Sequence, residues 1–387
     1  MKFNNMKSYK CNIPDIEIYF NESDIVIYSK NYLECLSNAA FNGGRIRSNS
    51  IVNHHVSLYF DHSQVENILN SVKKKFNLSD SMIGLLTAVK MNECILINEI
   101  NDNVNYSIVL TAGILNPSGP EDGDSNLSRE VDDSNARYVK PGTINIILLI
   151  DAILTEHALV NLIITITEAK TLILKKFDLR TKSGNLATGT STDTIVVCFT
   201  NRGKSIEWSG YATKFGQSVG QSVMKALNIS LREKVNFKPN RPILDRLLER
   251  GINKHDLINA IIEMYEPHSS VEDVDKLKGK IEDILCDLNK DYNLGALLLA
   301  GIRLNEEVQN ESIPNLSKDF FSKESPLINS DEIIGTTIAN YIGGTRGVKE
   351  FYKLNKNKPR ILKKLNNFLD NTIGGLIAGI SSLIFKS

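Results

Sequence analysis

The chain has 387 residues, of which 42% are hydrophobic and 23% are charged. This composition excludes a mostly disordered or fibrous chain, and the length predicts two or three domains of ordinary size. Lysine and arginine together number 45, as do aspartate and glutamate, so the formal net charge is zero. Without a global positive field to hold nucleic acid or an anionic membrane surface, we expect neither as a partner.

The five cysteines are scattered along the chain and form no C-x-x-C pair. This spacing favours reduced, buried thiols over a disulfide framework or a zinc site, and it indicates a cytoplasmic protein. The first 15 residues carry charge but no apolar core, so a signal peptide is not expected there. The most membrane-like stretch, residues 373–385, has 13 residues. A spanning helix needs roughly 20, so we expect a buried helix and no transmembrane segment.

Hydrophobic periodicity divides the chain into two parts. Before about residue 235, short β-rich runs alternate with helical patterns, which predicts an N-terminal α/β or α+β domain. We expect strands over 16–20, 24–28, 55–59, 94–100, 106–113, 143–150 and 193–200. We expect helices over 64–76, 81–86, 156–177 and 216–231.

The β pattern ends at the segment 236–242, where Pro239 and Pro242 interrupt any continuing helix or central strand. We therefore predict two domains, residues 1–237 and an all-α helical domain over 238–387. Its helices are expected over 242–250, 254–265, 271–289, 294–308, 330–341 and 360–384.

Two long polar connections stand out, residues 117–141 and residues 310–329. A structureless loop as long as the first is uncommon inside a domain, and such loops are usually lids, insertions or disordered segments. We expect disorder rather than a lid over 117–141, and an interhelical loop over 310–329.

The segment ATGTSTD, residues 187–193, places four hydroxyl residues, a glycine and an acid directly before an apolar strand. Gly189 permits close approach of a ligand, and hydroxyl groups beside it can bind a phosphate or an amide carbonyl. A turn held by side-chain hydrogen bonds has the same composition. The catalytic candidates here are Thr188, Thr190, Ser191, Thr192 and the acid Asp193.

Two other apolar segments carry isolated polar residues. Gly142 and Thr143 open a predicted strand in which Asn145 lies among isoleucines. Glu168 and Lys170 lie in a very apolar predicted helix, where charge is costly unless it is paired, functional or able to reach the helix rim. We assign Gly142, Thr143 and Gly189 to substrate binding, Glu168 to acid–base work, and Asn145 and Lys170 to oxyanion or carbonyl donation.

These segments together resemble one family. LSNAAFNGGRIRSNSIVN at 36–53, TAG at 111–113, GTINIILLID at 142–151, ITEAK at 166–170 and ATGTSTD look like the adenosylcobinamide amidohydrolase family, over roughly residues 15–230. The resemblance implies hydrolysis of the amide joining the corrin ring to its aminopropanol arm, giving adenosylcobyric acid in archaeal corrinoid salvage. The acidic insertion at 117–133 departs from the family.

The nucleophile of this reaction stays open. Either a hydroxyl attacks through a nearby base, or a carboxylate or metal activates water. No Ser-His-Asp spacing decides between them, and no cofactor of this half is predicted with certainty.

Acidic and basic residues also gather in the helical half. Asp331 and Glu332 begin a predicted helix behind Ser330, a candidate N-cap, and Asp370 lies near the start of an apolar run. Acids on two helices beside the glycine-rich basic segment 343–362 predict a Mg²⁺ and phosphate site. Helix capping and a solvated basic loop are the alternatives.

A second resemblance covers roughly residues 241–387. SDEIIGTTIANYIGGTRGVKEFYKLNKNKP and FLDNTIGGLIAGISS are similar to archaeal α-ribazole-5′-phosphate phosphatase, within the all-helical phosphatidylglycerophosphatase A superfamily. The resemblance implies the metal ligands Asp331, Glu332 and Asp370, with Asp370 also catalytic, and the substrate-binding residues Thr345, Arg346 and Lys358. Asn371 stands where that family usually has a second acid, which weakens the expected metal site.

The two resemblances imply a bifunctional hydrolase of corrinoid salvage that acts on adenosylcobinamide and α-ribazole 5′-phosphate. One alternative is a corrinoid-binding module fused to a metal-dependent phosphatase of lipid or other phosphates. Another is an inactive phosphatase half that serves in oligomerisation. Glycine-rich helical surfaces in residues 241–387 predict a homo-oligomer through that half.

Overall fold

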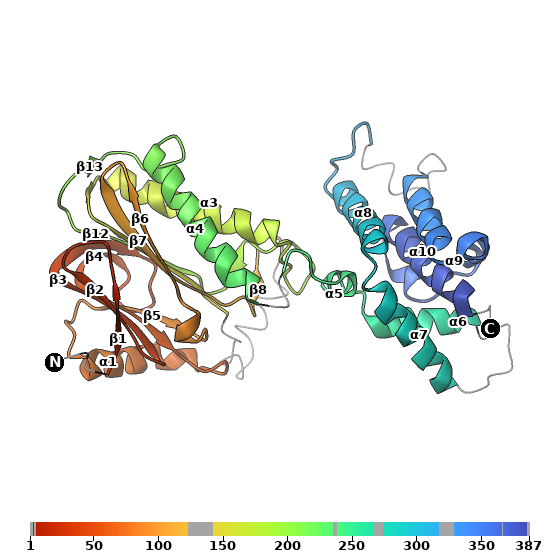
Figure 1. Cartoon of the computed structure of the whole chain (residues 1–387), viewed down its shortest axis with the longest axis horizontal. Coiled ribbons are helices and arrows are strands. Elements are labelled where there is room, and N and C mark those ends of the chain that lie inside the picture. Colours follow the sequence, from red (N-terminus) through yellow and green to blue (C-terminus); the bar gives the residue numbers. More distant parts are fainter. Residues whose placement is uncertain are drawn as a thin grey trace. The chain divides into compact units, whose positions relative to one another are not determined.

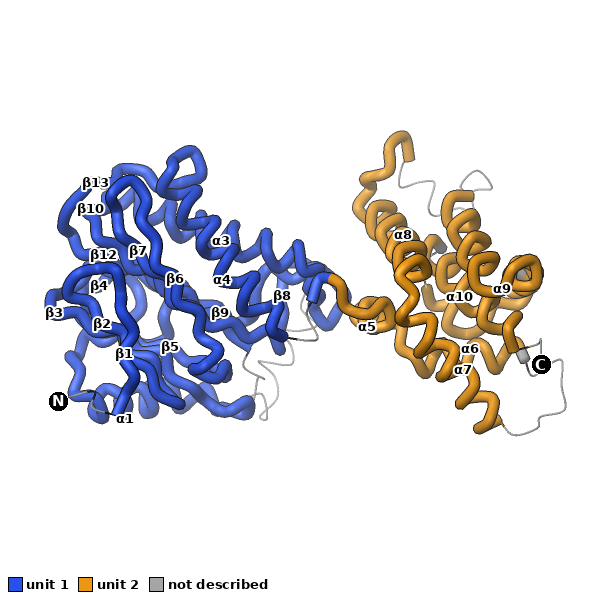
Figure 2. The backbone as a smooth tube through the Cα atoms, viewed as in Figure 1, with its two compact units in different colours: residues 1–239 blue, residues 240–387 orange. Residues whose placement is uncertain are grey.

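The computed structural model describes residues 5–122, 142–234, 238–265, 274–316, 329–365 and 367–384, together with Phe3. The chain divides into two compact units, unit 1 over Met1–Pro239 and unit 2 over Asn240–Ser387 (Figure 2). Unit 1 combines a curled mixed sheet with helices, whereas the described part of unit 2 is helical. The predicted order, a mixed α and β region followed by a helical region, is confirmed.

Within the described residues, nine strands form the main sheet of unit 1. They are β1 (Lys7–Lys10), β2 (Ile16–Phe20), β3 (Asp24–Ser37), β4 (Gly44–His55), β5 (Ile83–Thr87), β6 (Ile95–Asn101), β7 (Val104–Ala112), β9 (Ile144–Ile150) and β12 (Thr194–Phe199). The order is β1-β2-β3-β12-β9-β7-β6, and β4 lies between β3 and β5. Short ladders join β8 (Pro117–Ser118) to β11 (Gly189–Thr190), and β10 (Ile153–Leu154) to β13 (Ser205–Ile206).

The curl of the sheet originates in β3. Its pairing with β4 shifts register between Tyr28 and Leu33, and such an irregularity bends a strand. The first half of β3 pairs with β2 and the second half with β12, so the two parts of the sheet face each other. Apolar side chains from both parts, including Ile27, Ile51 and Val196, pack into one buried cluster between them.

Helices cover the outer faces of this sheet (Figure 1). The helices α3 (Glu156–Lys176) and α4 (Lys214–Arg232) pack side by side over β6, β7 and β12. The helix α1 (Val65–Lys75) covers β3, β4 and β5 through Leu69 and Val72. Among the described helices, α3 alone has the length and apolarity to cross a membrane, but half of that stretch is buried inside unit 1.

Two predicted elements of unit 1 are wrong. The expected strand over 55–59 is a turn, because β4 already ends at His55 after a polar sequence of serines, arginines and asparagines. The expected helix over 81–86 is the strand β5, which pairs parallel with β4 and is largely buried. Of the connection 117–141, the structure describes Pro117–Asp122, where β8 pairs with β11, and residues 123–141 lie outside the described part.

Unit 2 surrounds one apolar helix. Its described helices are α5 (Ile243–Leu248), α6 (Lys254–Tyr265), α7 (Val274–Leu288), α8 (Tyr292–Gln309), α9 (Ser330–Lys356) and α10 (Asn367–Ile384), with a 3₁₀ turn at Leu362–Lys364. The core gathers around Ile373, Leu376 and Ile377 of α10, which contact α6, α7, α8 and α9. Of the predicted loop over 310–329, residues 317–328 lie outside the described part.

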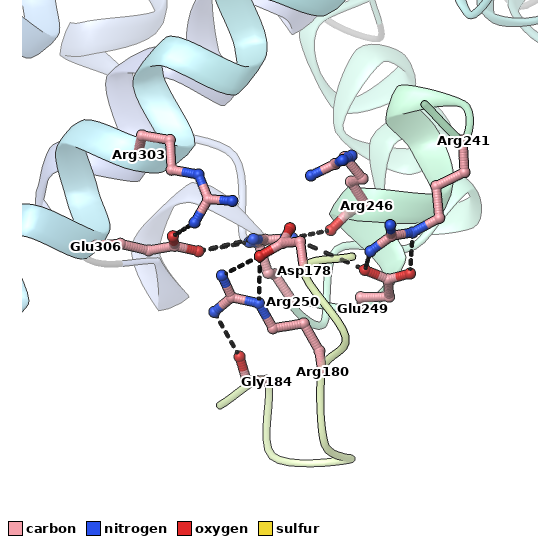
Figure 3. Close-up of polar contacts among 9 residues, drawn as sticks. All are labelled: Asp178, Arg180, Gly184, Arg241, Arg246, Glu249, Arg250, Arg303 and Glu306. Atoms are coloured by element: carbon pink, nitrogen blue, oxygen red, sulfur yellow. Dashed lines mark hydrogen bonds and ion pairs between the residues drawn. The ribbon is translucent and has the colours of Figure 1, made fainter. Parts of the chain in front are cut away.

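Arginine–glutamate pairs hold the start of unit 2 together (Figure 3). Arg241 donates through two nitrogens to Glu249, at 2.6 and 2.5 Å, and Arg250 binds Glu306 of α8 at 2.8 Å. Separately, Arg180 of unit 1 donates to Asp178 at 2.6 Å and to a carbonyl oxygen within its own loop. Two-point guanidinium–carboxylate pairing fixes orientation as well as distance.

The helix α9 reverses direction at Gly344, whose φ of 60° and ψ of −150° are not helical. Past this residue Gly347 lies against Ala339, and Phe351 lies against Gly335, so the two halves run antiparallel. The expected loop over 343–362 is therefore wrong for residues 345–356, which are helical. The reversal returns the end of α9 to the neighbourhood of its own beginning.

Candidate functional site

The centre of the ATGTSTD turn is the carboxylate of Asp193. It accepts hydrogen bonds from Lys170 Nζ at 2.5 Å, from Thr190 Oγ1 at 2.5 Å, and from the amides of Thr190 and Ile144 at 3.1 and 3.0 Å. The side chains of Lys170 and Asp193 are only 10% and 9% exposed. This buried pair joins α3 to the turn, and four donors fix the carboxylate.

The turn has no room for a side chain at Gly189. A Cβ there would lie 2.4 Å from Asp193 Oδ2 and 2.9 Å from Lys170 Nζ. Thr188 bonds through its backbone to Ser118 and to the hydroxyl of Thr171, which anchors the turn on both sides. Close packing of this kind requires glycine for steric reasons, whatever the backbone angles are.

A small cavity of about 90 Å³ lies beside this turn. Thr143 from the start of β9 and Thr192 from the turn line it, and their hydroxyl oxygens are 2.7 Å apart. Thr192 Oγ1 also reaches the carbonyl oxygen of Gly142, at the long distance of 3.5 Å. Ser191 is exposed and accepts a hydrogen bond from Asn116. The predicted residues of the two segments thus meet at one place.

Asn145 lies on β9 two residues after Thr143, and it is bound to Leu86, one of the residues that line the cavity. Its amide nitrogen donates to Asn53 Oδ1 at 2.9 Å and to the carbonyl oxygen of Leu86 at 3.0 Å. Asn53 in turn donates to Thr111, so three predicted motif segments share one buried polar chain. The oxygen Oδ1 of Asn145 is buried and has no hydrogen-bond partner within the described structure, which leaves an acceptor for a proton donor.

Glu168 and Lys170 do not act as a pair. Glu168 is exposed on α3, whereas Lys170 is buried and bound to Asp193. Helical geometry explains the difference, because residues two positions apart project about 200° apart around the axis. Among the described residues Glu168 makes no hydrogen bond or ion pair with the turn, so the structure separates it from the other candidates.

Two residues outside the predicted set belong to this site. Asn38 donates to the carbonyl oxygen of Asp193 and accepts from the amide of Ile195, both at 2.8 Å, so it fastens the turn to the end of β3. His62 lines the small cavity from the segment before α1, with its ring edge-on to Phe60 at 5.5 Å. His62 lies 130 positions before Thr192 in the sequence, and no local motif connects them.

A larger concavity of about 860 Å³ lies elsewhere on unit 1, lined by Lys7, Lys75 and Lys90 among others. None of the motif residues lines it. Lys75 is engaged there with the buried Asp24, at 2.8 Å, and His54 bonds the same carboxylate at 2.7 Å. Burial alone would raise the pKa of Asp24, but the hydrogen bonds from His54 and Lys75 and their charges outweigh it and lower that pKa.

In unit 2 the reversal of α9 gathers a second polar cluster. Lys358 Nζ lies 2.6 Å from Asp370 Oδ2, and Asn371 Nδ2 donates to Asp331 Oδ2 at 2.6 Å. Both acids are buried, at 7% exposure for Asp331 and 4% for Asp370. The second oxygen of Asp370, Oδ1, is buried and has no partner among the described atoms. Burial, followed by the nearby charge of Asp331, raises the pKa of Asp370 against the lowering effect of Lys358.

The structure separates other residues of the predicted phosphate site from this cluster. Thr345 and Arg346 are exposed at the reversal of α9, roughly 20 Å along the helix from Asp331 at 1.5 Å per residue. Glu332 is half-buried next to Asp331. The expected N-cap Ser330 is instead the first helical residue, after Asn329, which makes no capping side-chain bond.

The donor set around Asp370 fits a hard cation only in part. No group of three or more histidine, cysteine, aspartate or glutamate side chains is placed to hold a metal, as far as the chain is described. The carboxylates of Asp331 and Asp370 do lie near each other, with the amide nitrogen of Asn371 on Asp331 and one oxygen of Asp370 unsatisfied. Magnesium is commonly held by one or two carboxylates, with water and phosphate oxygens completing its shell. The cluster offers two carboxylates, which is within that range.

Comparisons with known proteins give a family for unit 1 and further relatives that cover parts of the chain. The family model for adenosylcobinamide amidohydrolase matches residues 11–239. An adenosylcobinamide amidohydrolase of Methanosarcina mazei is 29% identical over 221 residues, covering 55% of this chain and 96% of the relative. The uncharacterized protein MJ1330 of Methanocaldococcus jannaschii is 35% identical over 122 residues, covering 30% and 92%. The crystal structure of the low temperature requirement C protein from Listeria monocytogenes shares 22% identity over 37% of this chain and 92% of that chain, with a TM-score of 0.33.

Unit 1 is thus a hydrolase of the amidohydrolase class, with its hydroxyl-lined cavity at the turn where the matched motifs meet. The family match spans more than half of the chain, and the chain belongs to the adenosylcobinamide amidohydrolase family. Its N-terminal region carries adenosylcobinamide amidohydrolase activity.

Proposed function

We propose that amide cleavage takes place at the small cavity beside the ATGTSTD turn, and that it releases aminopropanol from the corrin ring. The hydroxyl pair of Thr143 and Thr192 supports this placement, because it joins the motif turn to the start of the neighbouring segment and lines the cavity. Their contact uses one hydroxyl proton. The other proton is held only by the long contact to Gly142, so it can turn to the carbonyl oxygen of a substrate amide.

Asp193 and Lys170 are positioning residues in this scheme. All four donors of Asp193 are internal, and each of its oxygens already accepts two hydrogen bonds. A carboxylate saturated in this way cannot take a proton from water without losing a partner. Its role is to hold Thr192 and the rest of the turn at the mouth of the cavity. Preorganised donors of this kind stabilise the charge that develops on the carbonyl oxygen.

Thr143→Val and Thr192→Val test the placement, since each keeps the shape of the residue and removes the hydroxyl. Each should lower adenosylcobinamide turnover by roughly 100-fold, the loss that follows removal of one oxyanion donor. Thr167→Val is the matched control, because Thr167 is exposed on α3 and bonds only within that helix. Wild-type turnover in both cavity variants would remove the cavity from the mechanism.

We also propose that unit 2 is a Mg²⁺-dependent phosphomonoesterase acting on α-ribazole 5′-phosphate. The single supporting observation is the buried, unsatisfied Oδ1 of Asp370 beside Asp331 and Lys358. A buried acceptor without a partner is rare in folded proteins and points to a missing ion or water. Asp331, Asp370 and the amide oxygen of Asn371 would hold the cation, which would neutralise charge on the phosphate oxygens. Lys358, already beside Asp370, would contribute a second positive charge to the bound phosphate.

Phosphate release from α-ribazole 5′-phosphate, with Mg²⁺ or with excess chelator, tests this second activity. Asp370→Asn should lower the rate by at least roughly 100-fold while the helical circular dichroism is kept. Asp287→Asn on the surface of α7 is the control, since Asp287 pairs only with exposed Lys290. Undiminished activity in chelator or in Asp370→Asn contradicts the proposal. Faster release from a phosphatidylglycerol phosphate would assign unit 2 to lipid phosphates instead.

A further inference from the structure

The small cavity of unit 1 has a size that selects its occupant. At about 90 Å³ it is far too small for a corrin ring. A protein cavity of about 150 Å³ holds one benzene molecule, which has six heavy atoms. By that scale the cavity admits a short aliphatic group of roughly four heavy atoms, such as the three carbons and one hydroxyl oxygen beyond an amide nitrogen at its mouth. A large substrate can therefore place only one small end inside it.

The lining of the cavity is of two chemical kinds. Val56, Phe60 and Leu85 are apolar, which suits a methyl or methylene group. Threonines at positions 87 and 194 lie in the lining besides the Thr143–Thr192 pair, and they suit a hydroxyl group of the ligand. A ligand pocket with an apolar lining and a few placed polar groups fixes both identity and orientation. The matching ligand class is a short amine that also bears a hydroxyl.

His62 is the titratable side chain among the residues that line this cavity. Neither of its ring nitrogens has a hydrogen-bond partner among the described residues, whereas His54 and His55 are bound to Asp24 and to the carbonyl oxygen of Val89. His157 is stacked on Trp208, away from the cavity. Because the cavity is so small, His62 lies within reach of any group that occupies it.

We propose that this cavity is the subsite for the amine side of the scissile amide, and that His62 protonates the departing nitrogen. This inference rests on the amide cleavage proposed above. The attacking water oxygen forms a bond to the carbonyl carbon, and the C–N bond breaks with its electron pair on nitrogen. The imidazolium N–H of His62 gives its proton to that nitrogen, and the imidazole recovers a proton from the attacking water. Amide and water become carboxylic acid and amine, with every proton accounted for.

Binding of the free amine tests the subsite without any turnover. The full chain is titrated with 1-amino-2-propanol, and separately with benzylamine, while ring signals of Phe60 and His62 are followed by NMR. The small amine should shift both signals with saturation in the millimolar range, as expected for a ligand of five heavy atoms. Benzylamine should leave them unchanged. No shift with the small amine, or equal shifts with both amines, overturns the subsite.

Leaving-group dependence tests the role of His62. His62→Ala should lower hydrolysis of the amide by roughly 100-fold, the usual contribution of general acid catalysis. It should lower hydrolysis of the phenyl ester of the same corrinoid acid less than tenfold, because phenoxide leaves without prior protonation. His157→Ala is the control histidine and should match the wild type on both substrates. Equal losses on amide and ester, or no loss on the amide, overturn the assignment.

The two tests separate this inference from the function on which it depends. If the wild type and His62→Ala cleave the amide equally well, the proposed function stands and the role of His62 is overturned. A wild-type chain that releases no aminopropanol overturns the proposed function, and the amine titration then decides the subsite alone.

Discussion

Both units contain a buried aspartate bound to a lysine, and the two aspartates differ in what else holds them. Asp193 of unit 1 accepts four internal hydrogen bonds, two on each oxygen. Asp370 of unit 2 is bound to Lys358 through one oxygen, and its other oxygen is buried without a partner. The first arrangement is complete without a ligand. The second leaves one buried acceptor open to an ion, a water or a proton.

This difference indicates which acid works on a substrate. In the proposed scheme the saturated carboxylate keeps the turn in shape, and the hydroxyls that the turn presents act on the substrate. An unsatisfied buried carboxylate costs free energy in the folded state, and active sites are where such costs recur. The sequence made Asp193 a catalytic acid candidate and Asp370 a metal ligand that is also catalytic, and their surroundings distinguish them further.

The largest expected effect is the loss of stability when the buried ion pair of Lys170 and Asp193 is broken. Lys170→Met leaves a buried carboxylate without its cation, and removing one partner of a buried ion pair typically costs about 3–5 kcal/mol. Urea unfolding followed by the fluorescence of Trp208, the single tryptophan of the chain, measures this loss in unit 1. Lys175→Met, at an exposed position on the same helix, should change stability by less than about 0.5 kcal/mol. Similar stabilities of the two variants would show that the pair is not essential to the turn.

Gly189 tests whether the turn around Asp193 has room for a side chain. Gly189→Ala places a methyl group within 2.4 Å of Asp193 Oδ2. We expect a loss of about 1–3 kcal/mol, the usual cost of overpacking, and a fall in adenosylcobinamide turnover, because the turn must move. Unfolding and turnover are measured on one preparation. A fully stable variant with unchanged turnover would mean that the turn tolerates displacement.

Asn371→Asp tests the Asp370 cluster of unit 2 by adding a carboxylate to it. It replaces the donor that binds Asp331 with a third carboxylate, so the free unit is less stable while Mg²⁺ binds more tightly. The melting temperature is measured as Mg²⁺ is added, and the midpoint is the Mg²⁺ concentration that gives half of the full rise. We expect this midpoint to fall by about tenfold, which corresponds to about 1.4 kcal/mol of binding free energy. Asn310→Asp adds the same charge at the exposed residue that follows α8 and should not change this concentration. An unchanged midpoint in Asn371→Asp contradicts a cation site at Asp370.

The smallest expected effects are opposite slopes of stability with pH. The pKa of Asp24 is lowered from 3.8, so its contribution is present above pH 3.8 and is lost as the pH falls through the lowered pKa. The pKa of Asp370 is raised from 3.8, so its contribution is present below pH 3.8 and is lost as the pH rises through the raised pKa. NMR titration of the two carboxyl carbons gives both values directly. Titration of Asp370 at or below 3.8 would contradict its unsatisfied burial.

Much of the fold was predictable because local patterns and tertiary structure agree. The strand over 16–20 and the helix over 254–265 occur with the predicted bounds. The strand β5 was predicted as a helix, because a short apolar run does not distinguish the two, and only pairing with β4 decides the matter. The turn at Gly344 was predicted as part of a loop, because glycine marks both loops and reversals within helical pairs.

The candidate sites were predictable where one segment carries the contacts. Thr192 and Asp193 lie in one motif, and Lys170 meets them because a buried charge requires a partner. His62 was not predicted, since it reaches the cavity only through the curl of the sheet that brings the segment after β4 against β9 and β12. Arg346 was assigned to the phosphate site by resemblance, and the length of the helix places it far from Asp370.

The most direct test of the account measures two products from the same samples. Full-length Thr192→Val and Asp370→Asn are each assayed for aminopropanol released from adenosylcobinamide and for phosphate released from α-ribazole 5′-phosphate. The account predicts that Thr192→Val loses about 100-fold in amine release and keeps phosphate release, and that Asp370→Asn shows the reverse. If either variant loses both activities while remaining folded, or if neither loses its own, the assignment of one reaction to each site is wrong.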